Sequence, residues 1–298
     1  MSNISSYLLK LSKLKVDRSK GTPAPHKAVL LISVIQLLDC GFITENKIRI
    51  TPELVARFKD NWWLLVKDDR FNPNFSLPFY HLKSDSFWNL KTIVGKEILL
   101  TSSFSIKSFS TLKDAVDFAY FEYDFYSFLM ESKNRIVFID QLLAVYLKGR
   151  QLSYVVEDTF SMVESQILHE SSADYSNEVK KLDAEDCFVR GGVFKKVIPR
   201  QYDYTCCISG MKIIATRDVQ MIDACHIVPF SETHDDTIKN GISLSPNLHR
   251  AFDRFLITIN QDFEVIVSTE FKESGYHSIR DFHGKKIHLP KSETITHL

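Results

Sequence analysis

Apolar residues recur at helical spacing through the first half of the chain. Leucines on one helical face predict a helix over residues 5–15. The almost unbroken apolar run over 28–38 predicts a helix that is buried on all sides, and Pro25 suits its first turn. Similar periodicity predicts three more helices, over residues 52–66, 114–130 and 136–147. The first 150 residues are therefore expected to form a helix-rich domain.

The pattern changes beyond residue 150. Periodicity fades and acidic residues accumulate over 151–189, which we interpret as a partly helical linker with a helix over 155–168. Short strand-like runs follow, at residues 194–198, 205–208, 213–215 and 221–224. A helical segment over 245–254 completes a small mixed domain over 190–298. We predict an α+β fold, in which a helix-rich domain over 1–150 is joined by the linker to this C-terminal domain.

Composition places the chain among globular proteins. It has 298 residues, of which 44% are hydrophobic and 12% aromatic, and this length corresponds to about two domains. No stretch approaches the ~18 uninterrupted apolar residues of a membrane span, and the N-terminus lacks a secretion signal. We therefore expect a soluble, cytoplasmic protein with no membrane partner. The five cysteines include no C-x-x-C pair, which argues against a disulfide framework and against structural zinc.

Charge is unevenly distributed along a chain whose formal net charge is zero. Residues 1–50 hold eight Lys and Arg against three acids, whereas residues 151–188 hold nine acids against two lysines. A basic stretch returns over 190–200. The N-terminal domain is thus suited to an anion, and the neutral balance of the whole chain does not exclude nucleic acid as a partner.

Three short motifs in the C-terminal domain carry the strongest chemical signal. His226 begins H-I-x-P, Asn240 begins N-G-x-x-L, and H-x-x-F-D runs from His249 to Asp253. Their order and spacing allow a strand, an exposed loop and a helix to fold back on one another. Together they resemble the HNH nucleases, whose ββα-metal architecture is also called the His-Me finger. The resemblance implies phosphodiester hydrolysis in this domain.

The residue types suit that chemistry. An imidazole titrates near neutral pH, so His226 is the candidate general base that deprotonates water. His249 and Asp253 lie one turn apart on a predicted helix and can hold one divalent cation, Mg²⁺ or Mn²⁺. Asn240 is expected to orient the loop that aims His226 through hydrogen bonds of its amide. We therefore predict His226, Asn240 and His249 as catalytic residues.

The third metal ligand is left open by the sequence. HNH proteins often place a ligand immediately before the base histidine, and here that position is Cys225. A thiol is a poor ligand for Mg²⁺, and a lone buried cysteine commonly acts as a small apolar side chain. Asp223 is the predicted third ligand, with a water molecule as the alternative.

Two segments of the N-terminal domain look equipped to bind an anion. His26 and Lys27 fall in the first turn of the predicted buried helix, where free backbone N–H groups favour a phosphate. Leu77 and Pro78, with His81 close behind, combine apolar groups with an imidazole. Cationic donors over an apolar floor suit a phosphorothioate, whose sulfur is larger and softer than oxygen and accepts hydrogen bonds poorly.

Longer motifs resemble the sulfur-binding domain of phosphorothioate-dependent, McrA-type (type IV) restriction endonucleases. They are P-H-K-x-x-L-L over 25–31, L-P-F-Y-H-L over 77–82 with D-x-x-W after it, and F-Y-S-F-L-M-E-S-K-N-R over 125–135. The residues implied to contact the modified phosphate and nearby bases are Arg18, His26 and Lys27. Those implied to line the sulfur site are Leu77, Pro78 and His81. In the alternative, the prolines only shape turns and residues 77–82 form a core strand.

The resemblance implies a modification-dependent restriction endonuclease that binds phosphorothioated duplex DNA and cuts it nearby. Since one HNH site cuts one strand, cleavage of both strands predicts a homodimer or two sequential nicks. Three alternatives stay open. The first is a nuclease dependent on 5-methylcytosine, with Tyr80, Phe87 and Trp88 as an aromatic cage for the base. The second is a non-selective HNH nuclease, and the third is a DNA-binding regulator with a silent HNH domain.

Overall fold

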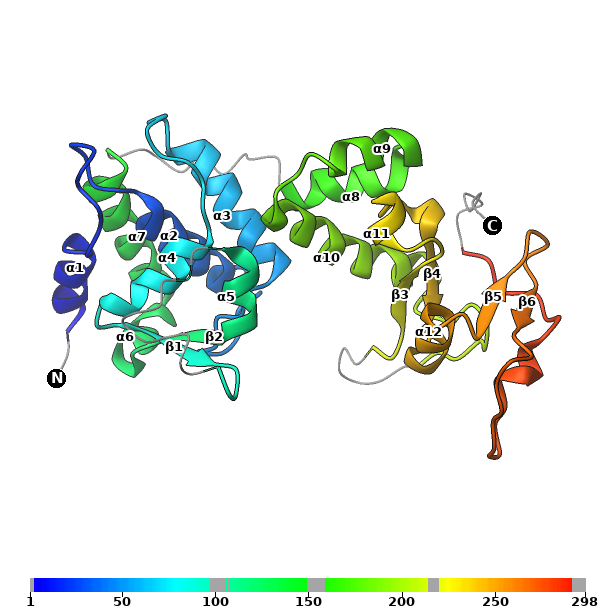
Figure 1. Ribbon diagram of the computed structural model, residues 1–298. Helices are drawn as coiled ribbons and strands as arrows, with labels where there is room; N and C mark the ends of the chain where they lie inside the picture. The colour runs from blue at the N-terminus through cyan, green and yellow to red at the C-terminus, as the bar shows by residue number, and fades with distance from the viewer. Residues whose placement is uncertain (1–2, 97–105, 107, 149–158, 214–219, 291–298) are drawn as a thin grey trace. The chain divides into compact units, whose positions relative to one another are not determined.

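The structure is a computed structural model that describes residues 3–96, 106, 108–148, 159–213 and 220–290. The chain divides into two compact units (Figure 1). Unit 1 comprises Met1–Thr159 and Ala184–Val189, and unit 2 comprises Phe160–Asp183 and Arg190–Leu298. None of the described helices is both long and apolar enough to cross a membrane.

Unit 1 is built around one buried helix. Its elements are α1 (Ile4–Ser12), α2 (His26–Asp39), α3 (Pro52–Leu65), α4 (Ser76–His81), η1 (Leu82–Ser84), β1 (Trp88–Thr92), α5 (Phe109–Ala115), β2 (Val116–Phe121), α6 (Tyr123–Leu129) and α7 (Ser132–Tyr146). Helices α3 and α7 pack against α2, and α1 packs against α7. Nearly every side chain of α2 is buried because its sequence offers no polar face.

Four of the helices predicted for unit 1 are confirmed. They are α1, α2, α3 and α7, which match the predictions over 5–15, 28–38, 52–66 and 136–147. Helix α3 begins where expected because the Thr51 side chain accepts a hydrogen bond from the Leu54 N–H and Pro52 occupies the first turn. The motif 77–82 forms α4 and the start of η1, so the core-strand alternative for this segment is wrong.

The single helix predicted over 114–130 is wrong. The segment instead contains the end of α5, strand β2 and helix α6. Strand β2 pairs antiparallel with β1, with Trp88 opposite Phe121 and Leu90 opposite Ala119. Aromatic and β-branched residues such as Val116 and Phe118 suit a strand, and pairing with a distant segment overrides the local helical spacing.

Unit 2 contains a strand pair and a helix in the order ββα. Its elements are α8 (Thr159–His169), α9 (Ser172–Val179), α10 (Ala184–Gln201), β3 (Asp223–His226), α11 (Phe230–Thr233), η3 (Ile238–Asn240), β4 (Gly241–Leu244), α12 (Pro246–Asp253), β5 (Ile257–Ile259), β6 (Val265–Val267) and η4 (Ile279–Phe282), and the first residues of α8 and α10 are assigned to unit 1. Strands β3 and β4 are antiparallel, with Cys225 opposite Ile242. Helix α12 packs against both strands.

The secondary structure predicted for unit 2 is correct within the HNH motifs and wrong in the segment that precedes them. Helix α12 confirms the prediction over 245–254, and β3 begins two residues after the start of the predicted strand 221–224. The predicted strand 194–198 is wrong, because these residues belong to α10. No strand is assigned over 205–208 either, where a turn begins at residue 207. Short apolar runs do not distinguish a strand from a buried helix face.

Two predictions fall partly outside the described residues. The predicted strand 213–215 is described only at its first residue, and the predicted helix 155–168 only from residue 159, where α8 begins. The predicted boundaries at 150 and 190 stay a prediction. Within the predicted linker, residues 160–183 group with unit 2.

Gly241 allows β4 to approach helix α10 closely. A Cβ atom at this position would overlap the Ile198 side chain and lie 3.0 Å from Cε2 of Phe194. We therefore expect Gly241→Ala to destabilise the protein by about 1–3 kcal/mol through overpacking, measured by urea unfolding. Gly191→Ala is the matched control, because its Cβ would meet nothing within 4 Å and alanine favours a helix. Equal effects of the two substitutions would contradict the close approach.

Candidate active site and anion pocket

His226 lies at the end of β3 with its ring fixed on two sides. The ring stacks on Phe194 of α10, with centroids 4.1 Å apart and planes 3° from parallel. Its Nε2 atom lies 2.7 Å from Oδ1 of Asp236, a buried residue. Neither Phe194 nor Asp236 was predicted from the sequence. The only local signal is the acidic pair Asp235-Asp236 between two motifs, and such pairs are common.

Asn240 ties the loop after β3 to the segment that precedes β4. Its Oδ1 accepts from the Val228 N–H at 2.8 Å, and its Nδ2 donates to the carbonyls of Val228 and Asp235, both at 2.9 Å. Its backbone carbonyl also accepts from the Ile227 N–H at 2.9 Å. Three of these four bonds hold the chain immediately after His226, and the fourth holds Asp235. The amide of Asn240 therefore makes the loop-holding bonds that the sequence led us to expect, while its catalytic role stays a prediction.

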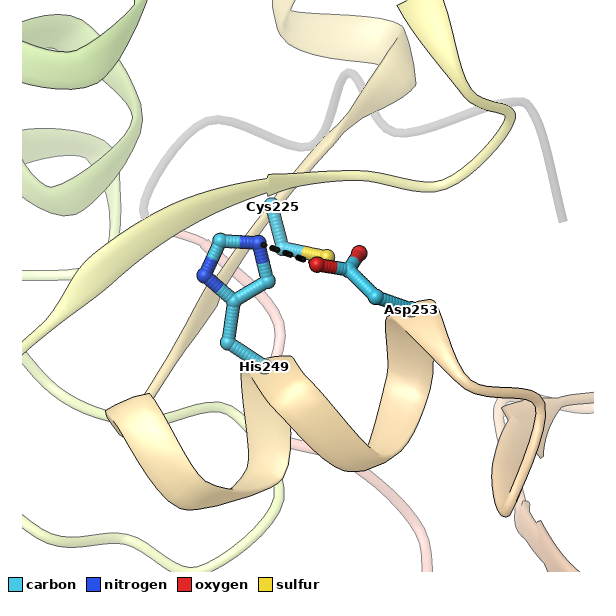
Figure 2. A group of neighbouring side chains, drawn as sticks. All are labelled: Cys225, His249 and Asp253. Carbon is cyan, nitrogen blue, oxygen red and sulfur yellow. Dashed lines mark ion pairs between the residues drawn. The ribbon is translucent and has the colours of Figure 1, made fainter.

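Helix α12 and strand β3 together present metal-ligating atoms. Figure 2 shows His249 and Asp253 projecting from α12 toward Cys225 on β3. Ligand atoms of these three residues all lie within 4.8 Å of one another, and His249 Nε2 is 3.5 Å from Asp253 Oδ2. Asp223 lies at the other ring nitrogen, with its Oδ2 3.3 Å from His249 Nδ1. The structure thus groups Cys225 with the pair His249 and Asp253 and places Asp223 at the other nitrogen of the His249 ring, so that Asp223 as the third ligand stays a prediction.

The Cys225 side chain is a buried thiol, and it would have to lose its proton to bind a metal. Its side chain is fully buried, and burial, together with the nearby carboxylates of Asp253 and Asp223, raises its pKa. Sulfur, imidazole nitrogen and carboxylate oxygen form a mixed donor set that fits a divalent transition metal better than Mg²⁺. The residues present therefore fit a divalent metal.

Unit 1 contains a pocket of about 610 Å³ at the N-terminus of α2. Five of the six predicted DNA-reading residues line it: His26, Lys27, Leu77, Pro78 and His81. The structure therefore brings together two motifs that lie some fifty positions apart in the sequence. The sixth, Arg18, is exposed and is not among the described residues that line this pocket.

Lys27 is held in a buried ion pair. Its Nζ lies 2.6 Å from Asp85 Oδ2 and 3.1 Å from Ser84 Oγ, and both charged residues are buried. Burial lowers the pKa of Lys27, and the bond to Asp85 opposes that shift. Asp85 also accepts from the Lys15 N–H at 3.0 Å. The positive charge of Lys27 is thus largely offset, and the lysine anchors one wall of the pocket.

The two pocket histidines favour the neutral form. Burial lowers the pKa of His26, whose Nε2 lies 2.9 Å from the Asn72 carbonyl oxygen. Burial also lowers the pKa of His81, with further contributions from Lys27 and Lys83. Both rings are therefore neutral over a wider pH range than a free imidazole. Pro78 is buried, and Leu77 is 36% exposed at the pocket.

The aromatic residues considered as a cage for a methylated base lie in the core. Tyr80, Phe87 and Trp88 are each at most 2% exposed. The indole N–H of Trp88 donates to the Phe79 carbonyl at 3.1 Å. These three side chains offer no accessible surface on which a base could stack, which removes the structural basis of the 5-methylcytosine alternative at this cluster.

Comparison with known proteins supports the assignment of unit 2. Residues 206–260 match the family model of the HNH endonucleases, and no curated protein matches the chain. The chain resembles the solved structure of ScoMcrA, a type IV phosphorothioation-dependent restriction endonuclease, with 11% identity and a TM-score of 0.31 over 82% of this chain and 94% of that one. The matched segment contains His226, Asn240, His249 and Asp253, and residues 206–260 are therefore an HNH endonuclease domain.

Proposed function

We propose that this protein is a metal-dependent endonuclease that recognises phosphorothioated duplex DNA with the pocket of unit 1 and hydrolyses a phosphodiester bond with the HNH site of unit 2. The observation that carries the nuclease half is the assembly of His226, His249 and Asp253 on a ββα unit within the segment that matches HNH endonucleases. A homodimer that cuts both strands stays part of this proposal.

Each residue of the HNH site has a defined part in the proposed reaction. His226 takes a proton from the attacking water, because it is the imidazole held at the end of β3. Asn240 keeps the loop after His226 in place through its amide bonds. His249 and Asp253, with Cys225 as the neighbouring donor, would hold the divalent metal. The metal supplies positive charge that stabilises the phosphorane and the leaving oxygen.

The pocket of unit 1 suits a soft, singly charged anion. Leu77 and Pro78 supply apolar surface, while the neutral imidazoles of His26 and His81 supply polar contacts without a second full charge. The side chains of Lys15 and Lys20 also line the pocket and contribute positive charge. A phosphorothioate satisfies both features, since it keeps the negative charge and replaces one hydrated oxygen by a weakly hydrated sulfur.

The test compares two duplexes of identical sequence, one with phosphorothioate linkages in varied contexts and one without, in Mg²⁺ and in Mn²⁺. We expect selective binding and cutting of the modified duplex. Equal cutting of both would keep the nuclease and discard the sulfur pocket in favour of a non-selective enzyme. Selective binding without cutting in either metal would instead support the DNA-binding regulator.

Leu77 offers a direct probe of sulfur recognition. We expect Leu77→Ala to lower the preference for modified over plain duplex roughly three- to tenfold, which corresponds to about one to two buried CH₂ groups at about 0.8 kcal/mol each, since about 1.4 kcal/mol is tenfold and the side chain is partly exposed. Fluorescence anisotropy with both duplexes measures the ratio. Ile93→Ala is the matched control, because Ile93 is 40% exposed in the same unit and does not line the pocket. A parallel loss of affinity for both duplexes would remove Leu77 from the sulfur contact.

A further inference from the structure

The contact between His226 and Asp236 determines which nitrogen of the imidazole carries the proton. A carboxylate only accepts hydrogen bonds, so the 2.7 Å contact requires Nε2 of His226 to be the donor. In the neutral ring this leaves the lone pair on Nδ1. We propose that Asp236 is a positioning residue that fixes the orientation and tautomer of His226, so that Nδ1 acts as the base. This inference rests on the proposed nuclease function.

Asp236 lies in a buried segment of unit 2. Its side chain is 2% exposed, and it sits between Asp235 and Thr237, which are also buried. The Asp235 carboxylate accepts from the Thr237 N–H at 2.8 Å, and the Thr237 hydroxyl lies 3.1 Å from Ser172 Oγ at the start of α9. Asp236 therefore lies in a buried segment whose neighbouring residues are hydrogen-bonded.

Helix α9 also places a buried tyrosine near the Asp236 carboxylate. Tyr175 is fully buried, and its pKa is raised first by burial and then by the negative charge of Asp236. The guanidinium carbon of Arg190 lies 4.9 Å from the centre of the Tyr175 ring. Residues of α9 thus lie near the segment that carries Asp236.

Stacking and hydrogen bonding constrain different motions of His226. The parallel contact with Phe194, at 4.1 Å between centroids, fixes the plane of the ring. The bond to Asp236 fixes rotation within that plane, which stacking alone leaves free. The His226 side chain remains 26% exposed, so the ring stays accessible to solvent while Nε2 is bound to Asp236. A base histidine needs one ring nitrogen held by a buried acceptor, here Nε2, and the other, here Nδ1, left to accept a proton.

The same bond also supports the charged form of His226 during the reaction. When Nδ1 takes a proton from water, Nε2 keeps its own proton and its bond to Asp236, and the positive ring faces a buried carboxylate. An oriented carboxylate of this kind holds the productive tautomer and stabilises the imidazolium that forms. Asp236 touches neither water nor phosphate in this scheme and acts only through His226.

Asp236→Asn is the discriminating variant because it preserves the size of the side chain. Its amide can donate to Nε2 and so favour the opposite tautomer. We expect the cleavage rate at saturating DNA to fall roughly 10²–10⁴-fold, with the Kd for the duplex changed less than about twofold. Selective ¹⁵N labelling of histidine then provides a spectroscopic readout: wild-type His226 shows the Nε2–H tautomer, and the variant shifts toward Nδ1–H.

Asp235→Asn is the matched control, since it changes the adjacent buried carboxylate while keeping an acceptor for the Thr237 N–H. It is expected to retain the wild-type tautomer and rate. An Nδ1–H tautomer in the wild type, or an Asp236→Asn variant that cuts at the wild-type rate, would overturn the inference. If the wild type cuts no duplex, the proposed function fails, and the ¹⁵N spectra of the two variants still decide whether Asp236 sets the tautomer.

Discussion

Replacement of His226 by alanine is expected to abolish cutting while the protein still binds DNA. The substitution removes the proposed base and leaves the pocket of unit 1 untouched. General-base catalysis contributes roughly 10²–10⁴-fold to the rate, so single-turnover cleavage of a phosphorothioated duplex should fall by at least about 100-fold. Anisotropy measured without metal should give an unchanged Kd, because the base acts in the chemical step.

His277→Ala is the control for this experiment. It removes an exposed histidine of the same unit that lies outside the site, and it should cut at the wild-type rate. Cleavage that survives in His226→Ala would show that another group activates the water. Loss of DNA binding together with cleavage would show that the substitution disturbs more than the chemical step.

Replacement of His249 by alanine is expected to remove the metal and, with it, cleavage. His249 is the only imidazole in the described group of three ligating residues and faces both Asp253 and Asp223. Loss of one ligand of three should weaken binding of Mn²⁺ by at least about tenfold, since even partners that only orient a ligand are worth 10–100-fold. Calorimetric titration of the protein without DNA measures this directly. Unchanged Mn²⁺ affinity would contradict the assignment of the ligands.

The same titration with Co²⁺ identifies the third ligand. A Cys225 thiolate bound to cobalt gives a near-ultraviolet charge-transfer band, which Cys225→Ser should remove and Asp223→Asn should retain. A site completed by Asp223 or by water would bind Co²⁺ without that band. The outcome also bears on metal preference, because a thiolate ligand favours softer ions such as Zn²⁺ over the hard ions Mg²⁺ and Mn²⁺.

Local patterns were sufficient where a motif is compact. The His249–Asp253 face follows from a short spacing, and the buried helix α2 follows from its unbroken apolar run. The ββα order was implied by the resemblance to HNH nucleases, and β4 was not among the strands predicted from the apolar pattern. The strand β2 did not follow, because it exists only through pairing with β1. Helix α10 was missed for a related reason. Its apolar residues over 194–198 were interpreted as a strand, because a short apolar run fits a strand and a helix face that packs on the β3–β4 pair equally well.

The site shows the same division between local and distant information. The sequence indicated His226 and Asn240, but the contacts of Asp236 and Phe194 with His226 arise only when three separate segments meet. Charge compensation was equally hidden, since Lys27 was expected to face an anion and instead binds Asp85. A pattern along the chain indicates residue types and leaves their partners undetermined.

The buried pair of Lys27 and Asp85 limits how this pocket can change through evolution. Replacement of either partner alone would leave a buried charge without its counterion, which is strongly destabilising. Selection therefore cannot easily retune ligand preference through Lys27. Leu77 is under no such constraint, because its side chain is apolar and 36% exposed. Substitutions that change the ligand preference of the pocket should therefore accumulate at position 77, while Lys27 and Asp85 are retained.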